Sequence, residues 1–238
     1  MDRILVFLPT LNESRSASTL IAEINKVISV DFLVIDDGST DGTCDELIEL
    51  DLQNLVVKQR GTRLGIGSAH SEALRYAKIN SYDYILTMDA DGTHRVVDVI
   101  RILQSREYAD LIVGSRFAPG ARIADWPYMR VFLTHTAHLV TKFGLGLKYD
   151  CSSGLRCYKL ASFQMRLIKK FDAVGYDFFF KTMHQIVSEK RLILDFPVTL
   201  EARVLGNSKM TVSQACKSIT VLIFKVIEFR WKQLFTRF

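Results

Sequence analysis

Short apolar runs alternate with segments of helical periodicity along the first half of this 238-residue chain. The apolar runs are typical of strands and cover residues 3–8, 32–36, 55–59, 83–88 and 110–114. The segments between them place apolar residues at the spacing of an amphipathic helix and cover residues 15–29, 41–50, 67–79 and 96–106. Further helices are expected over residues 129–143 and near residues 160–170. This alternation predicts an α/β fold, with a mostly parallel, Rossmann-like sheet and helices on both faces.

Two of the predicted strands run directly into carboxylates. Asp36 and Asp37 follow one strand, and Asp89 and Asp91 follow another. A single acidic residue in such a place often caps the next helix. Because the carboxyl ends of parallel strands meet at one edge of a sheet, we expect both pairs to line a common site. Two pairs of carboxylates at one edge are suited to hold a metal ion and its anionic ligand.

The composition indicates a folded protein with anionic partners. Hydrophobic residues make up 48% of the chain and charged residues 24%, and the formal net charge is +5. An excess of positive charge favours phosphate esters, nucleic acid or acidic lipid. The chain has no zinc-knuckle spacing and no helix-turn-helix signature. We therefore expect small phosphate-bearing molecules rather than nucleic acid.

Several features predict a cytoplasmic location. The four cysteines form no C-x-x-C pair, which favours reduced thiols. The N-terminus lacks the features of a signal peptide, and no apolar segment approaches the roughly 20 residues that span a bilayer. We expect a protein that acts on the cytoplasmic face of a membrane without crossing it.

The C-terminal segment is predicted to be an amphipathic helix. We divide the chain into one compact domain over residues 1–210 and a helix over residues 211–238. Apolar residues cover most of this helix, while Lys217, Lys225 and Lys232 lie near one stripe. Such a helix can lie on a membrane surface beside anionic headgroups. It can equally pack on the domain or on a second copy in a homo-oligomer, and both alternatives stay open.

Several motifs resemble the GT-A glycosyltransferases of family 2. They are PTLNE at residues 9–13, VIDDGSTDGT at 34–43, GIGSA at 65–69, DAD at 89–91 and GSR at 114–116. Two later motifs, SGLR at residues 153–156 and RVLGNSKM at 203–210, look most like the dolichyl-phosphate (polyprenyl-phosphate) mannose synthase branch. Each motif alone is weak, but together they keep the order and spacing of the family.

The resemblance implies a nucleotide-diphosphate sugar as donor, GDP-mannose or a UDP-hexose. In the family the nucleotide lies across the first strands, where Asp37 would hydrogen-bond the base. The residues implied in donor binding are Pro9, Thr10, Leu11, Glu13, Ile35, Asp37, Gly65, Gly67 and Ala90. Leu11 stands where the family usually has Tyr. An apolar side chain can still pack on a base or ribose.

A metal site follows from the resemblance and also from the chemistry. By resemblance, Asp91 is the main ligand, Asp89 contacts the sugar or the metal, and Thr93 stands at a third contact position. A diphosphate leaving group gathers negative charge, which a cation held by carboxylates neutralises. Mg²⁺ or Mn²⁺ suits these oxygen ligands.

The same branch implies a polyprenyl or dolichyl phosphate as acceptor, receiving a hexose such as mannose with inversion. An ionised phosphate needs cations to position it and no general base. The implied cations are Arg116, Arg130, Arg203 and Lys209, and Thr134 stands where the branch commonly has Ser. We expect Asp89, Asp91, Arg116 and Arg203 to carry the catalysis.

Two other functions fit the sequence. A family 2 transferase in surface polysaccharide synthesis would act on a sugar hydroxyl and need a general base, for which Asp150 is the candidate. A non-catalytic subunit would bind a nucleotide sugar and dock through the basic C-terminal helix. Such a subunit has no chemical reason to retain Asp89 and Asp91.

Overall fold

The computed structural model describes residues 2–124, 126–171, 173–201 and 226. Its strands are β1 (Ile4–Thr10), β2 (Asp31–Asp36), β3 (Leu55–Gln59), β4 (Tyr84–Thr87), β5 (Leu111–Ser115), β6 (Arg122–Ile123), β7 (Arg156–Lys159), β8 (Ile193–Pro197) and β9 (Thr199–Leu200). Its α-helices are α1 (Ser16–Val27), α2 (Thr43–Glu49), α3 (Ile66–Ile79), α4 (Val96–Gln104), α5 (Tyr128–Leu139), α6 (Met165–Ile168) and α7 (Asp177–Ser188). Three short helical turns are η1 (Arg106–Tyr108), the π-helical η2 (Val140–Gly144) and η3 (Leu160–Ser162).

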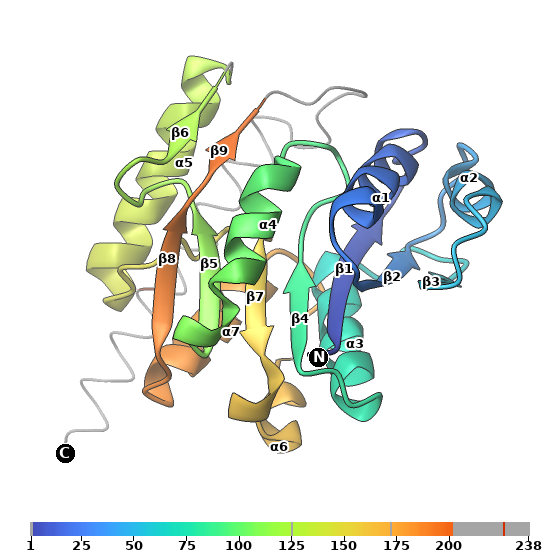
Figure 1. Ribbon diagram of the computed structural model, residues 1–238. Coiled ribbons are helices and arrows are strands. Elements are labelled where there is room, and N and C mark those ends of the chain that lie inside the picture. The colour runs from blue at the N-terminus through green and yellow to red at the C-terminus, as the bar shows by residue number, and fades with distance from the viewer. Residues whose placement is uncertain (1, 125, 172, 202–225, 227–238) are drawn as a thin grey trace.

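Seven strands form one sheet in the order β3-β2-β1-β4-β7-β5-β8 (Figure 1). Strand β7 runs antiparallel to its neighbours β4 and β5, and the other described pairs of this sheet are parallel. Strands β6 and β9 form a small second sheet. The expected mostly parallel α/β sheet is confirmed.

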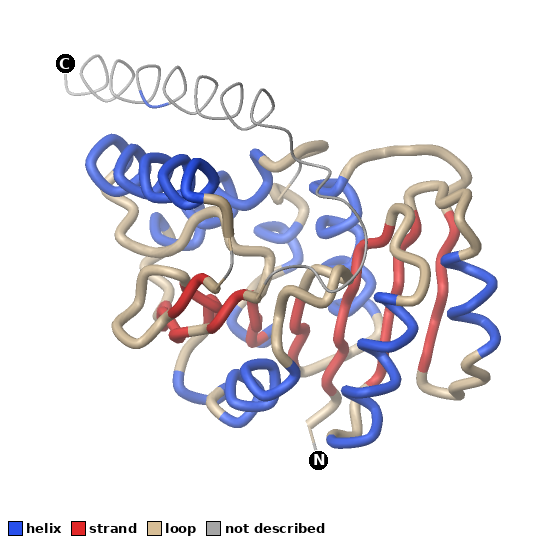
Figure 2. Tube along the Cα trace, turned by 90° about the horizontal axis from the view of Figure 1, so that it is seen from above, coloured by secondary structure: helices blue, strands red, loops and turns tan. Residues whose placement is uncertain are grey.

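The sheet is the middle layer of the molecule, with helices on both faces (Figure 2). Alternate side chains of β1 pack on opposite faces of the sheet. Leu5 and Phe7 belong to the core under α3 and α7, whereas Ile4, Val6 and Leu8 belong to the core under α1 and α4. A strand that is buried on both faces reads as a continuous apolar run, which is why the sequence showed it so plainly.

Three sequence-based expectations need adjustment. The helix expected near residues 160–170 is the turn η3 followed by the four-residue α6. The helix expected from Met129 to Phe143 begins at Tyr128, and its last turn widens into the π-helical η2. Strand β7 was not expected as a strand, because only two apolar residues, Cys157 and Tyr158, stand between its polar ends Arg156 and Lys159.

The predicted C-terminal helix over residues 211–238 and its boundary at residue 210 lie outside the described residues, apart from Val226. None of the helices in the described ranges combines the length and apolar character needed to cross a membrane.

Candidate active site

The acidic motifs meet at the carboxyl edge of the parallel strands. β1 and β2 end in register at Thr10 and Asp36, and β4 leads directly into Asp89. Because β7 is antiparallel, the loop before it reaches the same edge. The Thr87 hydroxyl at the end of β4 donates a 2.7 Å hydrogen bond to the Gly154 carbonyl in that loop. One edge therefore collects residues from four segments of the sequence.

Asp36 organises the turn that follows β2. Its carboxylate accepts hydrogen bonds from the Gly38 and Ser39 amides at 3.0 and 2.8 Å and from the Thr10 hydroxyl at 2.8 Å. Burial alone would raise the pKa of this carboxyl, but the hydrogen bonds, led by those from Ser39, hold it below its ordinary value. Asp36 therefore holds the turn after β2 through the two amides, and its bond from Thr10 joins this turn to the end of β1.

Asp37 joins that loop to the start of α3. Its two oxygens accept hydrogen bonds from Arg60 Nη1 at 2.9 Å and from the Gly65 amide at 2.8 Å. Arg60 is almost fully buried and also pairs with Glu72 at 2.8 Å. A base contact by Asp37 would share the carboxylate with these groups. Arg60 was not predicted from the sequence, where its only signal was a basic residue directly after a strand.

Gly65 and Gly67 are required by packing. Gly65 has a φ of +95°, and a Cβ there would lie 2.4 Å from the Val174 carbonyl oxygen. A Cβ on Gly67 would lie 2.3 Å from the Ala173 carbonyl oxygen. The absence of a side chain at both positions lets the segment 173–175 pack closely against the start of α3, and the expected donor contact of these glycines stays a prediction.

The DAD motif combines one ordered and one accessible carboxylate. Asp91 Oδ1 accepts hydrogen bonds from the Thr93 amide at 3.1 Å and the Thr93 hydroxyl at 2.7 Å, and both residues are buried. The Asp89 side chain is 40% exposed, with His94 Nε2 3.6 Å from Oδ2. A Cβ on Gly154 would lie only 3.0 Å from Asp89 Oδ1, so glycine leaves room beside this carboxylate.

This donor set fits Mg²⁺ or Mn²⁺. Carboxylate and hydroxyl oxygens are hard ligands, and Mg²⁺ typically binds one or two carboxylates together with substrate phosphates. Within the described ranges no group of three or more His, Cys, Asp or Glu side chains is placed to hold a metal. Asp89 and Asp91 would hold the ion, and Thr93 orients Asp91 through the hydroxyl bond.

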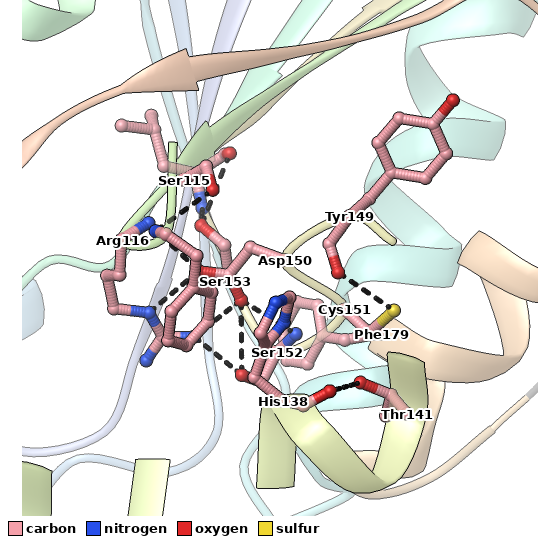
Figure 3. A network of polar contacts seen from close by, with 12 residues as sticks. Ser115, Arg116, His138, Thr141, Tyr149, Asp150, Cys151, Ser152, Ser153 and Phe179 are labelled. Carbon is pink, nitrogen blue, oxygen red and sulfur yellow. Dashed lines mark hydrogen bonds and ion pairs between the residues drawn. The ribbon is translucent and has the colours of Figure 1, made fainter. Parts of the chain in front are cut away.

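Arg116 is fixed by Asp150 (Figure 3). The guanidinium forms a two-pronged pair with the carboxylate, with Nε and Nη2 at 2.8 and 2.7 Å from its oxygens. Nη2 also donates to the Ser152 hydroxyl at 2.5 Å. Burial would raise the pKa of Asp150, but the Arg116 charge holds it below its ordinary value. The Nε–Nη2 edge of Arg116 is thus committed to Asp150, and a phosphate contact would use its remaining donors.

A second carboxylate lies beside this pair. Asp195, on β8, has its pKa raised to about 6 by burial and by the negative charge of Asp150. This neighbour could not be predicted from the sequence, because β8 and the Asp150 loop are far apart along the chain.

Arg156, the last residue of the SGLR motif, is fully buried and forms hydrogen bonds with the loop that contains Asp150. Nη2 donates to the carbonyls of Cys151 at 3.1 Å and Phe179 at 2.9 Å, and Nε donates to the Ser153 carbonyl at 3.0 Å. These bonds tie the loop to α7. The basic residue of the motif therefore has a structural role here.

The other predicted residues lie at the carboxyl edge of the sheet, in the core or on α5. Pro9, Leu11 and Glu13 lie partly buried at the end of β1 and in the loop that follows it. The side chains of Ile35 and Ala90 are buried in the two core clusters, so a donor contact by either residue would use its backbone.

Arg130 and Thr134 lie one turn apart on α5. This helix reaches the edge through His138, whose ring stacks on Phe117 at 3.9 Å, one residue after Arg116. Arg203 and Lys209 lie outside the described residues.

A mostly parallel sheet with the DAD motif at its carboxyl edge is the arrangement that the resemblance to GT-A glycosyltransferases implies. The sequence profile of glycosyl transferase family 2 matches residues 5–181, and the chain belongs to this family. The expected resemblance is confirmed.

Two relatives extend the likeness over nearly the whole chain. A polyprenol monophosphomannose synthase of Mycolicibacterium smegmatis is 32% identical, covering 95% of this chain and 86% of its own. An undecaprenyl-phosphate mannosyltransferase of Micrococcus luteus is 30% identical, covering 92% and 93%. Among solved structures, the glucosyl-3-phosphoglycerate synthase of Mycobacterium tuberculosis, in complex with Mn²⁺, UDP and phosphoglyceric acid, has a TM-score of 0.69 at 17% identity, covering 94% of this chain and 78% of that one. This last likeness supports the fold.

Proposed function

We propose that this protein transfers mannose from a nucleoside diphosphate mannose to a polyprenyl phosphate, with inversion at the anomeric carbon. The observation that carries the proposal is the match to the two mannosyl-transferring relatives over more than nine-tenths of the chain. The carboxylates gathered at the sheet edge supply the matching chemistry. GDP-mannose is the leading donor, and a UDP-hexose is the alternative.

Asp89 and Asp91 are the proposed ligands of Mg²⁺ or Mn²⁺. When bound, the ion supplies Lewis-acid neutralisation of the charge that develops on the diphosphate. The hydrogen bonds from Thr93 fix the Asp91 carboxylate before the donor arrives, which avoids reorganisation during the reaction.

The surroundings of Asp150 favour a phosphate acceptor over a sugar hydroxyl. A general base needs a pKa near the working pH and must reach the proton that it removes. Asp150 is fully buried, its two oxygens accept from Arg116, and its pKa is lowered. A phosphate acceptor is already anionic and needs no such base. Asp150 then acts by holding Arg116.

Helix α5 provides support for work at a membrane surface. It has no buried residue, and Tyr128, Phe132 and, just beyond its end, Phe143 are 95%, 65% and 70% exposed. The spacings of 4 and 11 residues between them place all three on one side of the helical segment. Exposed aromatic residues on a helix that carries no acidic residue suit a lipid interface. We propose peripheral binding to the membrane that carries the acceptor.

The direct test is a transfer assay with radiolabelled GDP-mannose and a polyprenyl phosphate in detergent, with Mn²⁺ or with EDTA. We expect labelled lipid with the metal and a loss of about a hundredfold or more in Asp91→Asn. UDP-glucose and an oligosaccharide acceptor are run in parallel. Transfer to the oligosaccharide alone would support the polysaccharide alternative.

A further inference from the structure

A cation–π contact holds Arg130 at the start of α5. The guanidinium carbon of Arg130 lies 3.6 Å from the centroid of the Trp126 ring. The two residues are four apart, and Pro127 between them caps the helix, its carbonyl accepting from the Arg130 amide at 2.9 Å. The start of the helix therefore brings the indole and the guanidinium together.

The indole is itself held in place. Trp126 packs against the core cluster on the α1 and α4 side of the sheet. Two residues earlier, the Ala124 amide donates to the Leu200 carbonyl at 2.9 Å, next to the pairing of β6 with β9. The packing of the Trp126 ring and the nearby backbone bond together hold the ring on which the Arg130 guanidinium stacks.

The hydrogen-bonding capacity of the indole does not explain its presence. Among the described residues no acceptor meets the buried Trp126 Nε1, and an unpaired buried donor is costly. A phenylalanine would fill much of the same space without that cost. The indole face, however, attracts a cation more strongly than any other side chain.

Stacking on the indole does not block the hydrogen-bond donors of the Arg130 guanidinium. Its N–H groups point outward in the plane of the group, whereas the ring covers one face. An in-plane, two-pronged contact with a phosphate therefore does not compete with the stack. The stack fixes the plane in which that contact forms, which reduces the conformational entropy lost on binding.

We propose that Trp126 is a positioning residue that presents Arg130 to the phosphate group of the acceptor. This inference rests on the proposed function and on the phosphate contact that the family resemblance implies for Arg130. Helix α5 connects Arg130 to the catalytic edge, because His138, about two turns further along the same helix, stacks on Phe117 next to Arg116. Trp126 acts through Arg130 and touches no substrate.

The test compares the steady-state constants of Trp126→Leu, Trp126→Phe and Arg130→Met in full-length protein. The acceptors are a polyprenyl phosphate in detergent and a short, water-soluble prenyl phosphate, so that adsorption to lipid is separated from phosphate recognition. We expect Trp126→Leu to raise the acceptor KM about tenfold while the donor KM stays within about twofold. Trp126→Phe should fall between wild type and Trp126→Leu.

A double variant isolates the coupling. In the Arg130→Met background there is no guanidinium to position, so adding Trp126→Leu should change the acceptor KM by less than about twofold. Tyr82→Leu is the matched control, because it removes another cation–π contact, 4.5 Å from Arg3, near the start of β4 at the opposite edge of the sheet. It should leave both KM values unchanged.

Three results would overturn the inference. They are an unchanged acceptor KM in Trp126→Leu, equal changes in donor and acceptor constants, or additive effects of the two single variants. A wild-type protein that transfers nothing to either prenyl phosphate would instead contradict the proposed function. Melting temperatures of all variants identify any loss due to misfolding, and Trp126→Phe, which keeps an aromatic ring, then decides the question.

Discussion

Asp150 and Asp195 are neighbours whose carboxyl groups titrate in opposite directions. The positive charge of Arg116 offsets burial at Asp150 and lowers its pKa. Burial dominates at Asp195, and the negative charge of Asp150 adds to it, so its pKa rises to about 6. Of these two carboxylates, Asp150 stays ionised at neutral pH, and Asp195 gains a proton in mildly acidic solution.

This difference predicts a pH-dependent stability. Between the ordinary pKa of 3.8 and about 6, folded Asp195 binds more protons than unfolded Asp195. Its contribution to stability therefore falls as the pH rises through this window. Asn cannot ionise, so Asp195→Asn should melt at a higher temperature than wild type at pH 7.5, and the difference should vanish below about pH 4. Thermal melts across this range provide the measurement.

Asp110 offers a control of opposite sign. Burial raises the pKa of this carboxyl, but the hydrogen bond from Ser162 and that from the Leu192 amide lower it overall. Asp110→Asn should therefore be less stable than wild type at pH 7.5. If both variants changed the melting temperature equally at every pH, the raised pKa assigned to Asp195 would be contradicted.

The Arg116–Asp150 pair should show strong coupling in unfolding experiments. Asp150→Asn leaves a nearly buried guanidinium without its counter-charge, and loss of one partner of a buried pair costs about 3–5 kcal/mol. The double variant Arg116→Met/Asp150→Asn should lose much less than the sum of the single losses. Urea unfolding of wild type, the two single variants and the double variant gives the coupling free energy of the pair. Additive losses would show that the pair contributes no coupling energy.

At the scale of elements, the start of α3 depends on a close contact with the segment 173–175. The Gly67 amide donates to the Val174 carbonyl at 2.9 Å, and a Cβ on Gly67 would overlap the Ala173 carbonyl. Gly67→Ala should cost about 1–3 kcal/mol in urea unfolding, because the backbone must shift. Gly175→Ala is the control, since a Cβ there meets only Asp177 Oδ1 at 3.5 Å. Equal stability of the two variants would contradict this reason for Gly67.

The sequence predicted the elements that are buried on both faces and missed those set by tertiary contacts. β1, β2 and β4 appear as apolar runs because both faces are covered. β7 has four residues, and it is a strand because β4 and β5 lie on either side of it. The helix expected over residues 160–170 shortened to η3 and α6, since its periodicity was too brief to specify a continuous helix.

The site was predictable where one motif carries both the residue and its position. Asp89 and Asp91 follow a recognisable strand, and their place at the edge follows from the parallel sheet. The contacts of Arg60 with Asp37 and of Asp195 with Asp150 join segments that no local pattern relates. They depend on the strand order, which the sequence alone did not supply.

At the scale of the molecule, the exposed aromatic residues of the α5 region should contribute to vesicle binding. Phe132→Ser and Phe143→Ser should each weaken binding to anionic vesicles about tenfold or more, because each removes a large apolar side chain from the interface. Co-sedimentation measures this. Tyr108→Ser, at an equally exposed aromatic residue of η1, is the control and should bind as wild type does. Equal losses in all three variants would contradict a specific role for α5.

The account depends most on the claim that Asp89 and Asp91 hold a divalent ion against a diphosphate at the sheet edge. The most direct measurement is an anomalous difference map from crystals soaked with GDP and Mn²⁺. We expect a manganese peak in contact with Asp91 and beside Asp89, adjoining the diphosphate, and no peak in Asp91→Asn crystals. Nucleotide bound away from this edge, or manganese that touches neither carboxylate, would contradict the account.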